Sequence, residues 1–134
     1  MDIYCLWEFR KEYEKLLKNN SYSYLEEEII KCFKDQQSAK DCLFGTNLNQ
    51  SHTTPYIKKD IGGRGGFRLY YIALCDKNIL CLGFVHPKKG AKGSDNTTPE
   101  FRSQLQKDIF QSLQSNSALK INFINNSIAF EEPQ

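Results

Sequence analysis

The stretch that decides the fold is GGRGGFRLYYIALCDKNILCLGFVHP, which spans residues 62–87. Residues 67–75 and 79–86 are rich in aromatic and aliphatic side chains, which favour strands. Between them, Asp76-Lys77-Asn78 has the composition of a turn. The pattern therefore predicts an antiparallel pair of strands. Both strands are almost continuously apolar, so we expect both faces of the sheet to be covered for much of their length.

The pairing of these two strands is predicted to bring polar side chains together. If the turn centres on Lys77, Arg68 lies opposite His86, and Tyr70 lies opposite Phe84. All four side chains then project from one side of the sheet. The sequence therefore predicts a patch that holds a cation, an imidazole and aromatic rings.

Four glycines surround Arg64 immediately before the first of these strands. Glycine adopts positive φ readily, so GGRGG indicates a tight connection from a preceding strand, residues 55–61. The segment has neither the dinucleotide-binding fingerprint nor the G-x-x-x-x-G-K-[ST] pattern of a P-loop. By itself it indicates a connection and no class of ligand.

The flanking sequence predicts helices on both sides of these strands. Residues 2–6 are expected as a first strand, and apolar residues then recur at helical spacing up to Leu17. A second helix is predicted from about Leu25 to near Gln37, and the short turn between the two helices indicates an antiparallel hairpin. After the strands, Thr98-Pro99-Glu100 is a helix N-terminal signal followed by apolar residues at four-residue steps.

These elements predict an α+β fold with the order β-α-α-β-β-β-α. We expect an antiparallel sheet of three or four strands with the N-terminal helical hairpin on one face. Residues 1–134 form one domain, in which residues 38–54 are a loop and residues 116–134 a C-terminal extension. Within the extension, residues 118–124 are predicted either as an edge strand that a partner can pair with, or as a segment that closes the domain's own sheet.

The positive charge of the chain is concentrated in its centre. Residues 58–92 carry a net charge of +6, whereas residues 1–57 and residues 93–134 each carry −2. Such an asymmetry favours an anionic partner, nucleic acid first, over an ordinary solvated face.

Cysteine usage and hydropathy narrow the class of protein. The five cysteines are odd in number and irregularly spaced, with no C-x-x-C pair, which indicates reduced thiols and a cytoplasmic location. The two histidines, His52 and His86, do not supply the ligand spacing of a zinc site, so we expect no metal and no cofactor. No apolar run reaches the roughly 20 residues of a membrane helix, and the N-terminus lacks a signal-peptide pattern.

Most of residues 2–115 resembles the RelE/ParE superfamily of bacterial toxins, and the closest likeness is to its HigB-like RelE branch. Those proteins commonly show a G-R/K-G-G-x-R strand start, a hairpin, a lysine-bearing loop, and an acidic-Asn-x-Thr stretch before the last helix. The opening IYCLWEFRKEYEKLL also resembles the family's first strand and helix. The matching residues in this chain are Gly63, Arg64, Gly65, Gly66, Arg68, Lys88, Lys89, Lys92, Asp95, Asn96, Thr98 and Glu100.

The resemblance implies the toxin of a type II toxin–antitoxin system, an mRNA endonuclease that acts on the ribosome and inhibits translation. Its expected partners are the ribosome, mRNA and a cognate antitoxin with a helix-turn-helix pattern. Cleavage through the 2′-hydroxyl needs proton transfer, for which His86 is the titrating candidate, and cations for the phosphorane. The candidate catalytic residues are Arg68, His86 and Arg64, and the candidate RNA-binding residues are Lys58, Lys59, Tyr70, Lys88, Lys89 and Lys92.

Other interpretations remain open at this point. Members of the superfamily that poison DNA gyrase share the fold, so the fold alone does not define the reaction. A basic RNA-binding module without catalysis would carry the same charge pattern. For single residues, His86 at a strand end could be a capping residue and Tyr70 a core residue.

Overall fold

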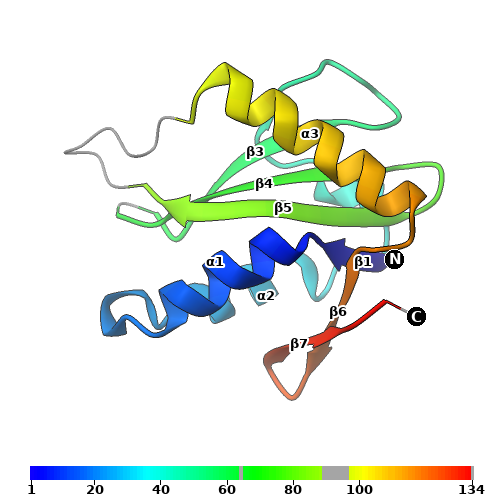
Figure 1. Cartoon of the computed structure of the whole chain (residues 1–134). Coiled ribbons are helices and arrows are strands. Elements are labelled where there is room, and N and C mark those ends of the chain that lie inside the picture. Colours follow the sequence, from blue (N-terminus) through cyan, green and yellow to red (C-terminus); the bar gives the residue numbers. More distant parts are fainter. Residues whose placement is uncertain (64, 89–96, 134) are drawn as a thin grey trace.

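The computed structural model describes residues 1–63, 65–88 and 97–133 (Figure 1). Within these ranges it contains three α-helices and one seven-stranded sheet with the order β2-β3-β4-β5-β1-β6-β7. The helices are α1 (Trp7–Leu17), α2 (Leu25–Phe33) and α3 (Pro99–Gln114). The strands are β1 (Asp2–Cys5), β2 (Thr46–Asn47), β3 (Tyr56–Ile61), β4 (Phe67–Leu74), β5 (Ile79–Pro87), β6 (Leu119–Ile124) and β7 (Ser127–Glu131).

The predicted α+β class is confirmed, but the predicted sheet of three or four strands is wrong. Strand β1 pairs in parallel with β5, and all other neighbouring strands are antiparallel. The additional strands come from two polar parts of the chain. The loop at residues 38–54 contributes β2, which is only two residues long, and the C-terminal extension contributes β7 next to β6, the strand expected at residues 118–124. These strands are short or only partly buried, so their sequences lack the continuous apolar runs that mark β4 and β5.

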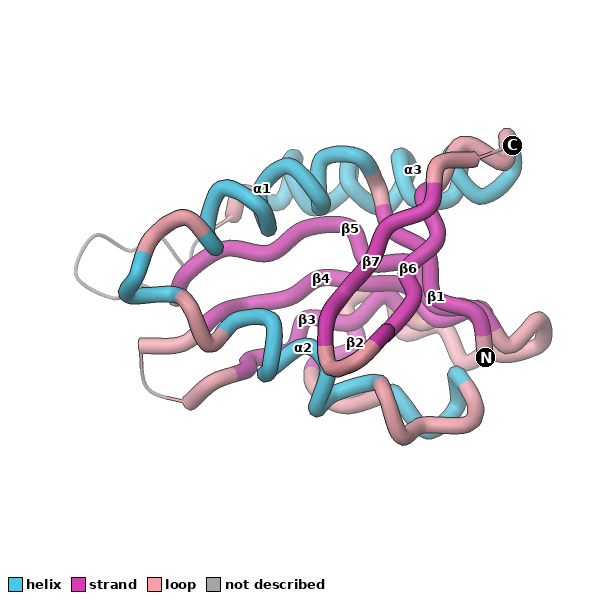
Figure 2. The backbone as a smooth tube through the Cα atoms, turned by 90° about the horizontal axis from the view of Figure 1, so that it is seen from below, coloured by secondary structure: helices cyan, strands magenta, loops and turns pink. Residues whose placement is uncertain are grey.

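Helices cover both faces of the central strands, as the apolar character of β4 and β5 predicts. Helices α1 and α2 lie on one face, and α3 lies on the other (Figures 1 and 2). Side chains alternate between the two hydrophobic clusters along β4: Leu69 and Tyr71 pack with α1 and α2, whereas Tyr70 and Ile72 pack with α3. The face that α3 covers is therefore the face on which Tyr70 lies.

The GGRGG segment forms the connection between β3 and β4. Gly62, Gly63 and Gly65 have φ of +78°, +65° and +73°, a region that favours glycine. At Gly66 a Cβ atom would lie 2.1 Å from the carbonyl oxygen of Ile61, so only glycine fits there. The Gly66 amide donates to the Gly63 carbonyl at 3.0 Å and closes the loop. Arg64 lies outside the described residues.

The register of the β4–β5 hairpin is as predicted at the polar end. Arg68 pairs with His86, and Tyr70 pairs with Phe84. The register shifts by one residue between Tyr70 and Tyr71, so that Tyr71 faces Leu82. Gly83 is the extra residue of this bulge, and a Cβ on it would lie 2.7 Å from Cδ1 of Ile109, which shows how closely α3 approaches.

Near the turn the predicted pairing is wrong by one residue. Leu74 faces Ile79, so the turn is centred between Asp76 and Lys77 and not on Lys77. The bulge at Gly83 compensates for this offset. The expected partners at Arg68 and Tyr70 are consequently reached through a turn of four residues, 75–78, in place of the three expected, followed by the extra residue Gly83.

Helix boundaries differ from the sequence-based expectations at one place. Helix α2 ends at Phe33 instead of near Gln37. At α3 the expected start is confirmed, because the Thr98 hydroxyl accepts a 3.0 Å hydrogen bond from the Phe101 amide. Short 3₁₀ turns at Asn20–Tyr22 and Ala39–Cys42 complete the connections, and Ala39 and Cys42 are buried.

The C-terminal extension closes the domain's own sheet. Strand β6 lies between β1 and β7, so it is not the edge strand that one of the two expectations proposed. Its Leu119 and Ile121 are buried in the hydrophobic core. Asn125 and Asn126, with φ of +51° and +63°, form the two-residue turn to β7.

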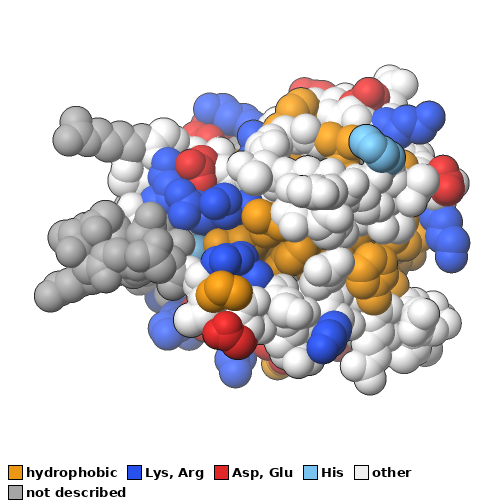
Figure 3. Space-filling view, turned by 90° about the horizontal axis from the view of Figure 1, so that it is seen from above, with side chains coloured by type: hydrophobic (Ala, Val, Ile, Leu, Met, Phe, Trp, Pro, Cys, Tyr) orange, Lys and Arg blue, Asp and Glu red, His pale blue; other side chains and the backbone are white. Residues whose placement is uncertain are grey.

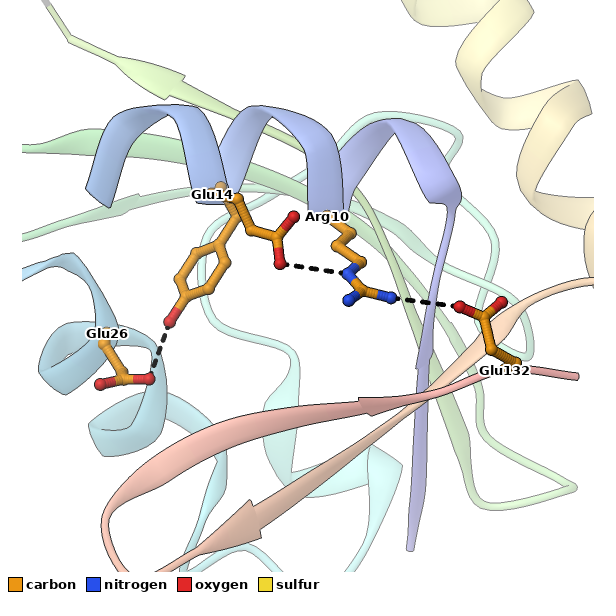
Figure 4. A network of polar contacts seen from close by, with 5 residues as sticks. Arg10, Glu14, Glu26 and Glu132 are labelled. Carbon is orange, nitrogen blue, oxygen red and sulfur yellow. Dashed lines mark hydrogen bonds and ion pairs between the residues drawn. The ribbon is translucent and has the colours of Figure 1, made fainter. Parts of the chain in front are cut away.

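Polar contacts attach this hairpin to the helices. The Glu26 carboxylate accepts hydrogen bonds from the Tyr13 hydroxyl and from the Ile128 amide, each at 3.0 Å. Arg10 contacts Glu14 at 3.2 Å and Glu132 at 3.4 Å (Figure 4). The extension is therefore an integral part of the fold.

Candidate functional site

Three charged side chains gather where β3 and β5 end and β4 begins, near the start of α3. Asp60 is the register partner of Arg68 across the β3–β4 hairpin. The Nε atom of Arg68 donates to Oδ1 of Asp60 at 2.8 Å, and the Nζ atom of Lys88 lies 3.9 Å from Oδ2. We call Asp60, Arg68 and Lys88 the charged cluster. Figure 3 shows Lys and Arg side chains (blue) gathered on this side of the molecule.

The charged cluster is unevenly exposed. The Asp60 side chain is 52% exposed, whereas the side chains of Arg68 and Lys88 are 15% and 19% exposed. The hydrogen bond from Arg68 lowers the pKa of Asp60 below its ordinary value, although partial burial opposes this. The charges of Arg68, Lys88 and Lys58 lower the same pKa further. Asp60 is therefore an anion at neutral pH.

His86 lies across from Arg68 and is buried, with 9% exposed. Its ring stacks on Tyr70 with centroids 5.9 Å apart, and it lies 5.8 Å from the ring of Phe84. The Nδ1 atom is 3.0 Å from the carbonyl oxygen of Pro87. The predicted grouping of a cation, an imidazole and two aromatic rings on one face is thus present.

Tyr70 has a packing role in this structure. The residue is 1% exposed, and its hydroxyl lies 3.0 Å from Oγ1 of Thr97. An aromatic ring that stacks on a base needs an exposed face. In this conformation Tyr70 has no exposed ring face, so its contribution to the site is to pack against the ring of His86.

The segment that enters α3 is fixed to the sheet by a second set of contacts. Arg102 donates from one guanidinium nitrogen to the Thr97 carbonyl oxygen and, at 2.9 Å, to the Thr97 hydroxyl. The Tyr56 hydroxyl donates to the Arg102 carbonyl oxygen at 2.9 Å. No role for Arg102 or Thr97 was predicted from the sequence. Together with Tyr70, they hold the start of α3 beside His86.

The two lysines predicted on β3 lie on opposite faces of the sheet. Lys58 lies two residues before Asp60 on β3, so its side chain projects from the same face as the charged cluster. Its positive charge lowers the pKa of Asp60. The Nζ atom of Lys59 lies 5.0 Å from the Phe44 ring, and its charge acts on Cys32 of α2. Lys59 therefore does not border the charged cluster, contrary to the expectation. The cause is the alternation of side chains along a strand, which separates any two adjacent residues.

Arg64, Lys89 and Lys92 lie outside the described residues. Of the nine candidate residues, the structure brings together Arg68, His86, Tyr70, Lys88 and Lys58. Asp60 is the member of the charged cluster that was not predicted from the sequence. The signal for it was present, because the glycine loop is symmetric about Arg64 and a hairpin centred there places Asp60 opposite Arg68.

A groove of about 910 Å³ lies at the other end of α3. Its walls include Leu74, Ile79, Phe110 and Leu113, with Lys120 from β6 on one side. None of the charged-cluster residues lines it. The groove and the candidate site are therefore separate features.

In residues 1–63, 65–88 and 97–133, no three His, Cys, Asp or Glu side chains gather as a metal site requires. None of the helices in the same ranges has the length and apolar character to cross a bilayer.

Comparison of the chain with protein-family models, with curated proteins and with solved structures finds no match.

Proposed function

We propose that this chain is the toxin of a type II toxin–antitoxin system and that it cleaves mRNA on the ribosome. The observation that carries the proposal is the cross-strand pair of Arg68 and His86, with Lys88 beside it, at the start of α3. The net charge of +6 in residues 58–92 supports an anionic substrate. The resemblance of the quoted residues to RelE/ParE toxins adds the class of substrate and the translational target.

The site offers groups suited to cleavage through the 2′-hydroxyl. A guanidinium binds two phosphate oxygens at once, so Arg68 suits the scissile phosphate and its developing charge. Lys88 and Lys58 supply further positive charge on the same face. His86 is the group that could transfer a proton, since imidazole titrates near neutral pH.

On this proposal the ribosome takes part in catalysis by aligning the mRNA. The chain has two histidines, and His52 is exposed in the loop before β3, away from His86 on β5. A self-sufficient ribonuclease that uses a pair of histidines is therefore not the model for this site. A ribosome that holds mRNA in a fixed geometry would supply the alignment of the 2′-hydroxyl.

A second candidate function is RNA binding without cleavage. The burial of His86 and the pairing of Arg68 with Asp60 favour it, because neither group is widely open to solvent. On this alternative the protein binds RNA with a steep salt dependence and leaves it intact.

The proposed antitoxin would neutralise the positive segment. A partner that presents carboxylates to the face of Arg68 and Lys88 would meet complementary charge, and salt would slow the encounter. A small adjacent gene with a helix-turn-helix pattern would support this part of the proposal.

The test compares mRNA on ribosomes with the same mRNA free in solution. Wild-type protein should cut ribosome-bound mRNA in a reconstituted translation system and cut free mRNA poorly. Arg68→Ala should abolish cutting and relieve growth arrest, with an unchanged circular dichroism spectrum. Lys107→Ala removes one exposed charge from α3 and should leave cutting intact. Intact mRNA in every reaction, with RNA binding retained, would select the non-catalytic alternative.

A further inference from the structure

We infer that Asp60 is a specificity-determining residue, because its carboxylate occupies the place on Arg68 and Lys88 that a phosphate group of RNA would take. Binding of RNA then requires that this carboxylate be displaced. The inference rests on the proposed function for its choice of RNA as the incoming anion. Its physical basis is the geometry of the charged cluster.

The contacts of Asp60 resemble those of a bound phosphate. One carboxylate oxygen accepts the 2.8 Å hydrogen bond from Nε of Arg68, and the other lies 3.9 Å from Nζ of Lys88. Two oxygens of one anion thus face two cations, which is the arrangement that arginine and lysine make with phosphate oxygens. The β3–β4 register fixes this placement, since Asp60 and Arg68 are directly paired.

The exposure of the three side chains shows what an incoming anion would meet. Asp60 is more than half exposed, whereas Arg68 and Lys88 are mostly covered. A phosphate that approaches the charged cluster therefore encounters the carboxylate as the solvent-facing member. Like charges repel, so the carboxylate lowers the affinity of these cations for any single phosphate.

The same exposure makes the exchange feasible. Ion pairs with a solvent-exposed member contribute little to stability, because water screens them and competes for each partner. A phosphate held firmly by other contacts could therefore replace Asp60 without unfolding the hairpin. Free RNA would bind weakly, and RNA held in place by a larger assembly would bind well.

The experiment measures affinity for RNA and does not depend on cleavage. A fluorescently labelled single-stranded RNA of 12 nucleotides serves as the probe, and anisotropy at fixed low ionic strength gives Kd. Asp60→Asn keeps the size of the side chain and removes its charge. We expect it to tighten binding about tenfold, the scale of one coupling between neighbouring charges.

Two controls isolate the local effect. Asp76→Asn makes the same charge change in the exposed turn at the far end of β4 and β5, and should change Kd less than about twofold. In an Arg68→Ala background, Asp60→Asn should lose most of its gain, because the cation that it uncovers is gone. Asp60→Ser serves as a second variant if Asp60→Asn alters the thermal midpoint.

Several results would overturn the inference. Unchanged or weaker binding by Asp60→Asn would show that the carboxylate orients Arg68 for RNA instead of competing with it. An equal gain in RNA affinity from Asp76→Asn would show that the effect of Asp60→Asn comes from the change in net charge alone. Failure of every variant to bind RNA would also overturn it. Since binding and cleavage are measured separately, a tenfold gain without any mRNA cutting would reject only the proposed nuclease activity.

Discussion

The carboxylate of Glu26, in the first turn of α2, accepts a 3.0 Å hydrogen bond from the backbone amide of Ile128 in β7. Strand β7 is the last strand in the sheet order, so this amide belongs to an edge. An unpaired edge amide is a site at which a foreign strand can add. Glu26 fills that position from within the chain. Together with the burial of Leu119 and Ile121, the contact indicates that the C-terminal hairpin supports the fold.

Truncation after Ser115 should therefore unfold the protein. It removes β6 and β7 and uncovers one side of β1. It also removes the core side chains of Leu119 and Ile121. Loss of one such buried Leu or Ile side chain costs about 2–5 kcal/mol. Because a domain of this size has only about 5–15 kcal/mol of net stability, we expect no cooperative thermal transition. Circular dichroism melting is the measurement.

A chain that ends at Glu132 is the matched control, since it keeps both strands and the Arg10–Glu132 contact. It should melt like the full chain. A folded, toxic protein that ends at Ser115 and escapes its antitoxin would instead show that the hairpin serves as a docking element.

Glu26→Ala should destabilise the protein by about 2 kcal/mol or more. The change leaves the Tyr13 hydroxyl and the Ile128 amide without their acceptor, and an unsatisfied buried polar group costs about 1–3 kcal/mol. Glu27→Ala, an exposed neighbour on the same helix, should stay within about 0.5 kcal/mol of wild type. Urea unfolding midpoints distinguish the two. Equal midpoints for both variants would mean that Glu26 adds nothing beyond surface charge.

The sequence predicts the central hairpin well because its apolar runs and turn composition are strong local signals. Arg68 and His86 are paired as expected, although the hairpin has a turn that is one residue longer than predicted and a bulge at Gly83. No pattern in the sequence predicts the bulge. It depends on the approach of α3, whose Ile109 packs over the glycine, and that contact is tertiary.

The remaining differences have physical causes of the same kind. Strands β2 and β7, which were not predicted, take their stability from neighbouring strands and helices, so their own sequences mark them weakly. Lys58 and Lys59 were both predicted to bind RNA, although the side chains of adjacent residues in a strand lie on opposite faces of the sheet. Asp60 was not predicted as a site residue because it is an anion in a positively charged segment, although a hairpin centred on Arg64 places it opposite Arg68.

The cysteines should react with alkylating reagents in an order set by burial. Cys5, Cys42 and Cys81 are buried, and burial raises the pKa of Cys81 to about 12 and that of Cys42 to about 11. Cys32 and Cys75 are half-buried, also with raised pKa values. Since the thiolate is the reactive form, iodoacetamide at pH 7.5 should label Cys32 and Cys75 slowly and the others hardly at all.

Peptide mass spectrometry after timed labelling gives the rates for each residue. In guanidinium chloride all five cysteines should react at similar rates, which controls for intrinsic reactivity. Labelling of Cys5 in the folded protein as fast as Cys75 would contradict the packing of β1 in the centre of the sheet.

The glycines of the β3–β4 loop should differ in their tolerance of alanine. At Gly66 a Cβ would lie 2.1 Å from the Ile61 carbonyl oxygen and 2.8 Å from the Gly62 carbonyl carbon, both backbone atoms. The loop would have to open, which strains the 2.8 Å hydrogen bond from the Lys88 amide to the Gly66 carbonyl oxygen. We expect Gly66→Ala to cost about 3 kcal/mol, the upper end for overpacking.

Gly63→Ala should cost less, because nothing lies within 4 Å of its Cβ position and only the positive φ of +65° opposes the change. That conformation costs a side chain about 1–2 kcal/mol. Urea denaturation of the two variants and wild type gives the ranking directly. The Lys88 contact adds a functional readout, since Gly66→Ala should also shift Lys88 and weaken RNA binding, whereas Gly63→Ala should not. A larger loss of stability for Gly63→Ala than for Gly66→Ala would contradict the close packing of the loop against Ile61.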